Sequence, residues 1–259
     1  MHPQLFLVRG NRVDSLVLVT QYLFLITMMG MAAASMYFWL ERDTLSIEFR
    51  SAATIAGIYT AIAAFMYWKM HTMVGTTGDA ASVVALPTHF RYIDWIVTTP
   101  LMLMNLMVLL QVSEDKRGLV IVMIAADVFM IVFGFFGERY SRMPGMEFQA
   151  WVMFGMGCLA YLILLYMMYS VLSDTARGKV APVQRAFLRM RLFILLGWSI
   201  YPLGFIIGML APDDGFKIAR ELVYNIADLI NKPGLGLVAL IAAKQITRDA
   251  AIRQAMRDL

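Results

Sequence analysis

The sequence predicts an all-α fold in which residues 1–259 form one domain, a bundle of seven transmembrane helices. Of the 259 residues, 60% are hydrophobic and 15% are charged, which is more apolar surface than a soluble domain of this length needs. Seven apolar segments are long enough to cross about 30 Å of hydrocarbon as helices, at roughly 20 residues each. The connections between them are short, which favours one compact bundle.

The spans follow one another along the chain, and four of them have a distinguishing feature. The first can act as its own insertion signal, because the stretch before it lacks a cleavable signal peptide. The third carries a polar stripe and Pro100, which has no backbone N–H, so we expect a slight kink. The fifth holds Cys158, the only cysteine, as a small core residue. The sixth begins with several arginines, which is typical of a helix end outside the bilayer. The predicted spans are 13–40, 50–73, 86–112, 118–137, 148–173, 183–211 and 217–243.

Basic residues predict the orientation of the bundle. With seven spans, the basic connections and the tail all fall on one side, which the positive-inside rule assigns to the cytoplasm. We therefore expect the N-terminus outside and the C-terminus in the cytoplasm, with Asp213 and Asp214 on the outer side. The net charge of +4 then reflects membrane topology and gives no case for nucleic-acid binding. The basic residues used here are Lys116, Arg117, Arg177, Lys179, Lys244, Arg248, Arg253 and Arg257.

Lys232 lies inside the last predicted span, four residues after Asp228. A lysine in the middle of a membrane costs roughly 3 kcal/mol or more. One helical turn separates the two residues, so the carboxylate faces the ammonium group and offsets its charge. A structural ion pair explains this pattern, and so does a covalent cofactor site, because a lysine amine forms Schiff bases with carbonyl compounds.

A polar stripe follows one face of the third span. Arg91, Asp94, Thr98 and Asn105 are three, four and seven residues apart, which places them on one side of a helix. Such a stripe serves either as hydrogen-bonding contacts between helices or as an ion or proton pathway. An Arg–Asp pair together with the Asp–Lys pair of the last span has no net charge, as a low-dielectric pocket requires. We therefore favour the pathway.

Aromatic residues lie beside these polar groups. Trp95 follows Asp94, Trp198 and Tyr201 share a face of the sixth span, and Tyr67 lies on the second. Flat aromatic walls suit an elongated conjugated ligand. Ordinary aromatic packing or an interfacial belt is the alternative, and the position of Trp198 in mid-span counts against a belt. No methionine, histidine or cysteine cluster has the spacing of a metal site.

Long motifs of this chain resemble those of the microbial rhodopsins, in particular the proteorhodopsin-like proton pumps. They are RYIDWIVTTPLMLMN in the third span, WSIYPLGF in the sixth and YNIADLINK in the seventh. AIAAFMY and AADVFM agree less strongly. The resemblance covers the seven spans in order. It implies a multi-pass protein of the cell (inner or cytoplasmic) membrane, in a homo-oligomer (trimer or pentamer), and leaves a carotenoid antenna or a transducer protein as open partners.

The resemblance also implies a chromophore and its site. All-trans retinal would be bound to Lys232 as a protonated Schiff base, with Asp94 and Asp228 as counterions and Asp94 as the proton acceptor. Thr98 would hydrogen-bond Asp94, Arg91 would be the outer gate, and Tyr67 would donate to Asp228. Asp127 would be protonated and structural, and Met102 would favour green absorption. The retinal pocket would contain Tyr67, Trp95, Met102, Met130, Gly134, Trp151, Trp198, Tyr201 and Pro202.

Three departures from the pump pattern stand out. Asn105 occupies the place of the carboxylic acid that returns a proton to the Schiff base from the cytoplasm. Met66 replaces the histidine that proteorhodopsins place beside the counterion. No outer proton-release pair is visible, since Glu138 and Glu221 are expected to be solvated surface charges and His89 a polar cap.

The predicted function is a light-driven outward proton pump. Asp94 favours it because an anionic acceptor can take the Schiff-base proton. The alternative is a sensory rhodopsin that signals to a partner protein, which Asn105 favours, because slow reprotonation prolongs the signalling state. A channel has less support, since the stripe has few polar residues, and an enzyme has least, since no catalytic domain is attached.

Overall fold

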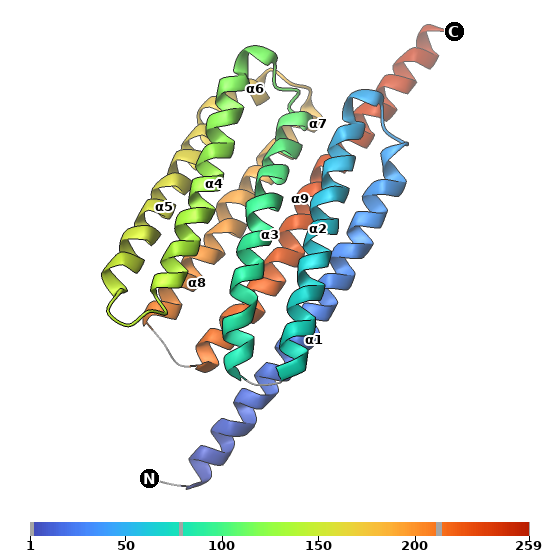
Figure 1. Ribbon diagram of the computed structural model, residues 1–259. Coiled ribbons are helices and arrows are strands. Elements are labelled where there is room, and N and C mark those ends of the chain that lie inside the picture. The colour runs from blue at the N-terminus through green and yellow to red at the C-terminus, as the bar shows by residue number, and fades with distance from the viewer. Residues whose placement is uncertain (1–2, 78–79, 211–213, 259) are drawn as a thin grey trace.

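The computed structural model describes residues 3–77, 80–210 and 214–258, and this part of the chain is helical, without strands (Figure 1). Asp213, used above for orientation, lies outside it, and so does the side chain of Asp214. The elements are α1 (Pro3–Arg42), α2 (Ile47–Thr77), α3 (Ala80–Leu109), η1 (Glu114–Lys116), α4 (Arg117–Tyr140), α5 (Glu147–Tyr169), α6 (Val171–Arg177), α7 (Ala181–Leu192), η2 (Phe193–Gly197), α8 (Trp198–Leu210) and α9 (Asp214–Arg257).

Seven stretches of the described residues are long and apolar enough to cross a membrane, which confirms the predicted fold class. They are Ser15–Arg42, Ile47–Val74, Thr88–Leu109, Glu114–Tyr140, Glu147–Arg177, Ala181–Leu210 and Gly215–Arg257. The last helix continues well past the predicted end at residue 243. Its extension is rich in alanine, arginine and glutamine, which favour helix, and contains neither glycine nor proline.

The bundle has two ends, seen at the bottom and top of Figure 1. The first, which we call the N-terminal end, holds the start of α1, the α4–α5 connection and the start of α9. The second, the C-terminal end, holds the α1–α2 and α3–α4 connections, α6 and the end of α9.

The interior of the bundle differs between these ends. A large apolar core occupies the half toward the C-terminal end, with residues such as Phe38, Leu103, Leu106, Phe187 and Met190. The buried arginines and glutamates lie instead in the half toward the N-terminal end, at the start of α3, the end of α4 and the start of α9. The buried charged side chains therefore lie where these two halves meet and from there toward the N-terminal end.

Candidate functional site

Lys232 of α9 lies between two carboxylates from different helices. Its Nζ donates to Oδ2 of Asp94 on α3 at 2.6 Å and to Oδ2 of Asp228 at 2.8 Å. All three side chains are buried, and Lys232 is the only buried lysine among the described residues. The one-turn spacing on α9 produced the contact with Asp228 that the sequence predicted. Asp94 adds a second negative charge, and its Oδ1 has no hydrogen-bond partner.

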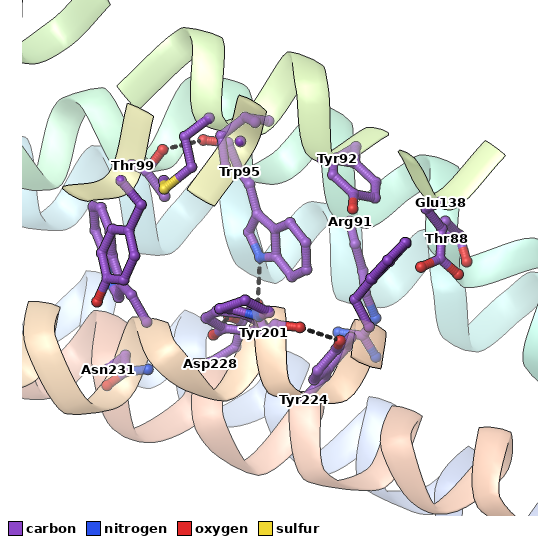
Figure 2. Close-up of a pocket in the computed structure, with 18 of the residues that line it drawn as sticks. Thr88, Arg91, Tyr92, Trp95, Thr99, Glu138, Tyr201, Tyr224, Asp228 and Asn231 are labelled. Atoms are coloured by element: carbon purple, nitrogen blue, oxygen red, sulfur yellow. Dashed lines mark hydrogen bonds between the residues drawn. The ribbon is translucent and has the colours of Figure 1, made fainter. Parts of the chain in front are cut away.

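Asp228 is held by aromatic side chains on three other helices. The hydroxyl of Tyr67 donates to its Oδ2 at 2.8 Å, and the indole N–H of Trp95 donates to the same oxygen at 3.4 Å. The hydroxyl of Tyr201 donates to Oδ1. In Figure 2 the Trp95 ring lies above Tyr201 and Asp228, and the two rings are tilted by 58° with their centroids 4.7 Å apart. Asp228 is thus fixed in place, whereas Asp94 keeps one oxygen free to accept a proton.

Thr98 and Asn105 lie on the predicted face of α3, but Thr98 does not bond the Asp94 carboxylate. Its hydroxyl donates to the backbone carbonyl of Asp94 at 2.9 Å, since a threonine inside a helix readily bonds the carbonyl four residues back. Asn105 is fully buried and donates from Nδ2 to the carbonyl of Ala52 on α2 at 3.0 Å. Eleven residues separate it from Asp94, or about 16 Å along the helix.

Arg91 pairs with glutamate, and the predicted Arg–Asp pair is wrong. Its Nε donates to Glu221 at 2.9 Å, and its terminal nitrogens donate to Asn225 at 2.5 Å and to the hydroxyl of Tyr67 at 2.9 Å. The Tyr67 hydroxyl accepts a hydrogen bond from Arg91 and donates one to Asp228, so it connects Arg91 to the counterion pair.

The expectation that Glu138 and Glu221 are solvated surface charges is also wrong. Their exposed fractions are 7% and 1%. Arg220 bridges them, at 3.1 Å to Glu138 and 3.2 Å to Glu221, and Arg142 adds a further pair with Glu138 at 2.9 Å. Burial is tolerated because each carboxylate contacts two arginines. His89 is exposed and packs against Phe135, as suits a residue near the end of a span.

The ionised groups form one balanced series from the middle of the bundle to its N-terminal end. Four basic side chains (Lys232, Arg91, Arg220 and Arg142) are matched by four acidic ones (Asp94, Asp228, Glu221 and Glu138). The charge balance predicted for the pocket therefore holds, but for a larger set of residues. Asp127 lies apart from this series and accepts a hydrogen bond from Thr99 at 2.8 Å.

A mostly apolar cavity extends along these residues, with Thr88 and Glu138 at one end and Asn231 toward the other (Figure 2), and Lys232 is among the residues that line it. The predicted pocket residues that line it are Trp95, Met102, Met130, Gly134, Trp198, Tyr201 and Pro202. Tyr67 is not among the lining residues, but it donates a hydrogen bond to the lining residue Asp228. Trp151 does not line the cavity: its side chain is 39% exposed, and its ring contacts the lining residues Phe154 and Phe205 from outside.

Several lining residues were missed from the sequence. Phe154 and Tyr161 are seven residues apart on α5 and share a helix face, which is a signal that could have found them. Tyr92 and Tyr224 also line the cavity, and Tyr224 donates to the carbonyl of Tyr201 at 2.8 Å. No group of metal-ligating residues occurs in the described part of the chain.

Comparison with known proteins identifies the family. Residues 18–246, most of the chain, match the family described as "Bacteriorhodopsin-like protein". The chain belongs to the bacteriorhodopsin-like family. A green-light absorbing proteorhodopsin of Gamma-proteobacterium EBAC31A08 is 33% identical over 211 residues, which cover 81% of this chain and 80% of the relative.

Other bacteriorhodopsin-like proteins are similar over most of their length. The crystal structure of Exiguobacterium sibiricum rhodopsin superposes with a TM-score of 0.83 at 42% identity, covering 90% of this chain and 98% of that one. Sensory rhodopsin-2 of Natronomonas pharaonis is 33% identical over 233 residues, covering 88% of this chain and 90% of the relative. The family consists of light-driven pumps and photoreceptors, and the seven spans make this chain a multi-pass protein of the cell membrane.

Bacteriorhodopsin-like proteins bind retinal through a lysine Schiff base, and the residues of this chain fit that group. The cavity supplies an apolar, aromatic-walled space, and the only buried lysine of the described residues lies on its wall. In the structure, the Lys232 ammonium stands for the protonated nitrogen of the linkage. Asp94 and Asp228 would hold that positive charge, and Trp95, Trp198 and Tyr201 would surround the polyene.

Proposed function

We propose that this protein is a light-driven outward proton pump in which Asp94 accepts the proton of the Lys232 nitrogen. The contact of 2.6 Å between Asp94 Oδ2 and Lys232 Nζ carries the proposal, because acceptor and donor are already within hydrogen-bonding distance. Retinal bound at Lys232 would supply the light-driven change in the acidity of that nitrogen. The second carboxylate, Asp228, is fixed by three aromatic donors and stays negatively charged when the proton moves to Asp94, so the transfer leaves the net charge of the site unchanged.

Direction of transport is supported by the asymmetry of the interior. From Asp228, which shares Lys232 with Asp94, a hydrogen-bonded series leads toward the N-terminal end through Tyr67, Arg91 and Glu221. Toward the C-terminal end, α3 beyond Thr99 buries apolar side chains and Asn105. A proton on Asp94 therefore lies beside a polar network on the side of the N-terminal end and faces an apolar barrier on the other.

Orientation follows from the distribution of basic residues. The connections and tail at the C-terminal end contain Lys116, Arg117, Lys179, Arg248 and Arg253. The positive-inside rule assigns this end to the cytoplasm. Protons would then leave at the N-terminal end, outside the cell.

A sensory rhodopsin is the second candidate. The 33% identity to sensory rhodopsin-2 over 88% of the chain favours it, and so does Asn105, which offers no proton for a fast return to the resting state. The two functions differ in net transport, because a sensor signals to its partner without exporting protons continuously.

Illumination of cells that express the protein with retinal distinguishes the two candidates. We expect sustained acidification of an unbuffered suspension, which a protonophore abolishes and which cells without the protein do not show. The measurement is external pH during a long light period. A pigment of normal colour without sustained acidification would contradict the pump and favour the sensor.

Asn105 should make proton return slow and dependent on pH. An amide cannot donate a proton, and no buried carboxyl group occurs on α9 beyond Lys232. The Lys232 nitrogen must then be reprotonated from the cytoplasm through water, at a rate proportional to the proton concentration. Flash photolysis should show the deprotonated state decaying more slowly as pH rises, and azide, a small weak acid, should accelerate the decay.

Asn105→Asp should make this decay faster and less dependent on pH. Asn105→Gln is the matched control, since it keeps an amide and should keep the pH dependence. A fast decay that is independent of pH in the unmodified protein would show that another internal donor exists.

A further inference from the structure

The sixth span is interrupted by a π-helical turn directly beside the cavity. The turn, η2, covers Phe193–Gly197 between α7 and α8 and ends immediately before the lining residue Trp198. A π turn accommodates one extra residue and disturbs the regular backbone ladder, and such turns are frequent at functional sites. Pro202 follows within α8 and lacks a backbone N–H. The backbone therefore departs from regular α-helical hydrogen bonding on both sides of Trp198.

Tyr161 of α5 contacts the carbonyl groups of this irregular segment. Its hydroxyl lies 2.7 Å from the carbonyl oxygen of Ile194 and 3.0 Å from that of Leu195, both within the π turn. The Ser199 hydroxyl lies 3.3 Å from the Tyr161 hydroxyl and itself donates to Leu195 O at 2.6 Å. Tyr161 is 8% exposed, so this contact between spans is shielded from solvent and lipid.

The other side of the π turn contacts α9 beside Lys232. A Cβ atom at Gly197 would overlap the amide oxygen of Asn231, the residue before Lys232. A Cβ atom at Gly234 would lie 2.8 Å from the ring of Phe193, so this ring packs against the α9 backbone just after Lys232. The π turn is therefore held between Tyr161 on one side and the Lys232 segment on the other.

We propose that Tyr161 is a positioning residue of the chromophore site. The Tyr161 hydroxyl holds the π turn in place, and the π turn then fixes the positions of Trp198 and Asn231 along the cavity. The inference rests on retinal occupying this cavity, as in the family, and not on the direction or the existence of transport. Tyr161 acts through the backbone of the sixth span, which sets it apart from residues that act on the chromophore by contact alone.

The first test compares Tyr161→Phe with Tyr166→Phe. Tyr166 lies on the same helix, is 70% exposed, and loses the same hydroxyl group without facing the π turn. We expect Tyr161→Phe to raise amide hydrogen exchange in residues 194–199 of the retinal-free protein about fivefold, the effect of one lost hydrogen bond. With retinal, it should also displace the absorption band. Tyr166→Phe should do neither, and unchanged exchange in Tyr161→Phe would overturn the proposal.

The second test removes the π turn itself. Leu196 is 65% exposed, so deleting it takes no side chain from the cavity and lets the turn close to an ordinary α-helical one, with both halves of the span facing as before. In this background, Tyr161→Phe should no longer displace the band relative to the deletion alone. An equal displacement in both backgrounds would show that the phenol acts on the chromophore by direct contact, and the positioning role would be wrong. If the deletion variant does not fold, the exchange comparison with Tyr166→Phe decides alone.

Discussion

Lys232→Ala is expected to abolish the visible absorption band that forms when retinal is added to the protein. Lys232 is the only buried lysine among the described residues and it borders the cavity, so no other amine there can form the linkage. The variant also leaves Asp94 and Asp228 without their shared positive charge. Breaking a buried ion pair in this way costs about 3–5 kcal/mol, so the variant should also be less stable. The measurement is the absorption spectrum after retinal addition.

Two further variants separate the loss of the linkage from the loss of the fold. Lys232→Arg keeps a positive charge between the carboxylates but cannot form a Schiff base, and it should be folded yet colourless. Lys244→Ala removes a lysine three turns further along α9, where its partner is Glu41 at 2.6 Å, and should keep the band. A visible band in Lys232→Arg would refute Lys232 as the attachment site.

Asp94→Asn is expected to stop transport and to shift the absorption band to the red. An asparagine cannot accept the proton of the Lys232 nitrogen, which lies 2.6 Å away in the native protein. Removing the negative charge beside that nitrogen also lowers the excitation energy of the chromophore. The native protein should acquire a similar red-shifted form in acid, as Asp94 becomes protonated. The measurements are the spectrum across pH and the light-induced pH change in cells.

Asp127→Asn is the matched control for this prediction. Asp127 is as deeply buried as Asp94, but it accepts a hydrogen bond from Thr99 and has no contact with Lys232. The Asp127→Asn variant should still transport protons and should not show the full red shift of Asp94→Asn. If Asp94→Asn still transported protons with an unchanged spectrum, Asp94 would not be the acceptor.

Helical periodicity and charge predicted which residues lie at the centre of the site, and the resemblance to microbial rhodopsins implied their roles. Lys232 and Asp228 are one turn apart on one helix, so their contact depends only on local geometry. Asp94 could be placed in the same pocket because the polar stripe of the third span and the Asp228–Lys232 pair together carry no net charge. The Lys232–Asp94 contact joins residues 138 positions apart, and its geometry required the fold.

The network at the N-terminal end could not be predicted in the same way. Glu138 and Glu221 lie near the ends of their spans, where the sequence does not distinguish a side chain that faces water from one that faces the bundle. Their burial depends on Arg220 and Arg91, which approach from other helices or other turns. Arg91 contacts Glu221 and not Asp94, and the Tyr67 hydroxyl lies between Arg91 and the counterion Asp228.

The π turn had no recognisable signal either. Phe193–Gly197 reads as ordinary apolar helix, and the extra residue becomes visible only from backbone positions. Trp151 was misplaced for a related reason. An aromatic residue on a nearly uniform apolar helix gives no indication of its direction, and this one is 39% exposed, outside the ring of cavity residues.

The unequal halves of the bundle have a consequence for work against a membrane voltage. An electric field falls mainly across the least polarisable part of its path, which here is the apolar half between Thr99 and the C-terminal end. Moving one charge through the whole membrane costs about 2.3 kcal/mol per 100 mV. For an outward pump, most of that cost would fall on proton uptake through the dry half and little on release through the polar half. A cell already strongly negative inside would then slow the refilling of the site, so the voltage that the protein helps to build would limit its own turnover.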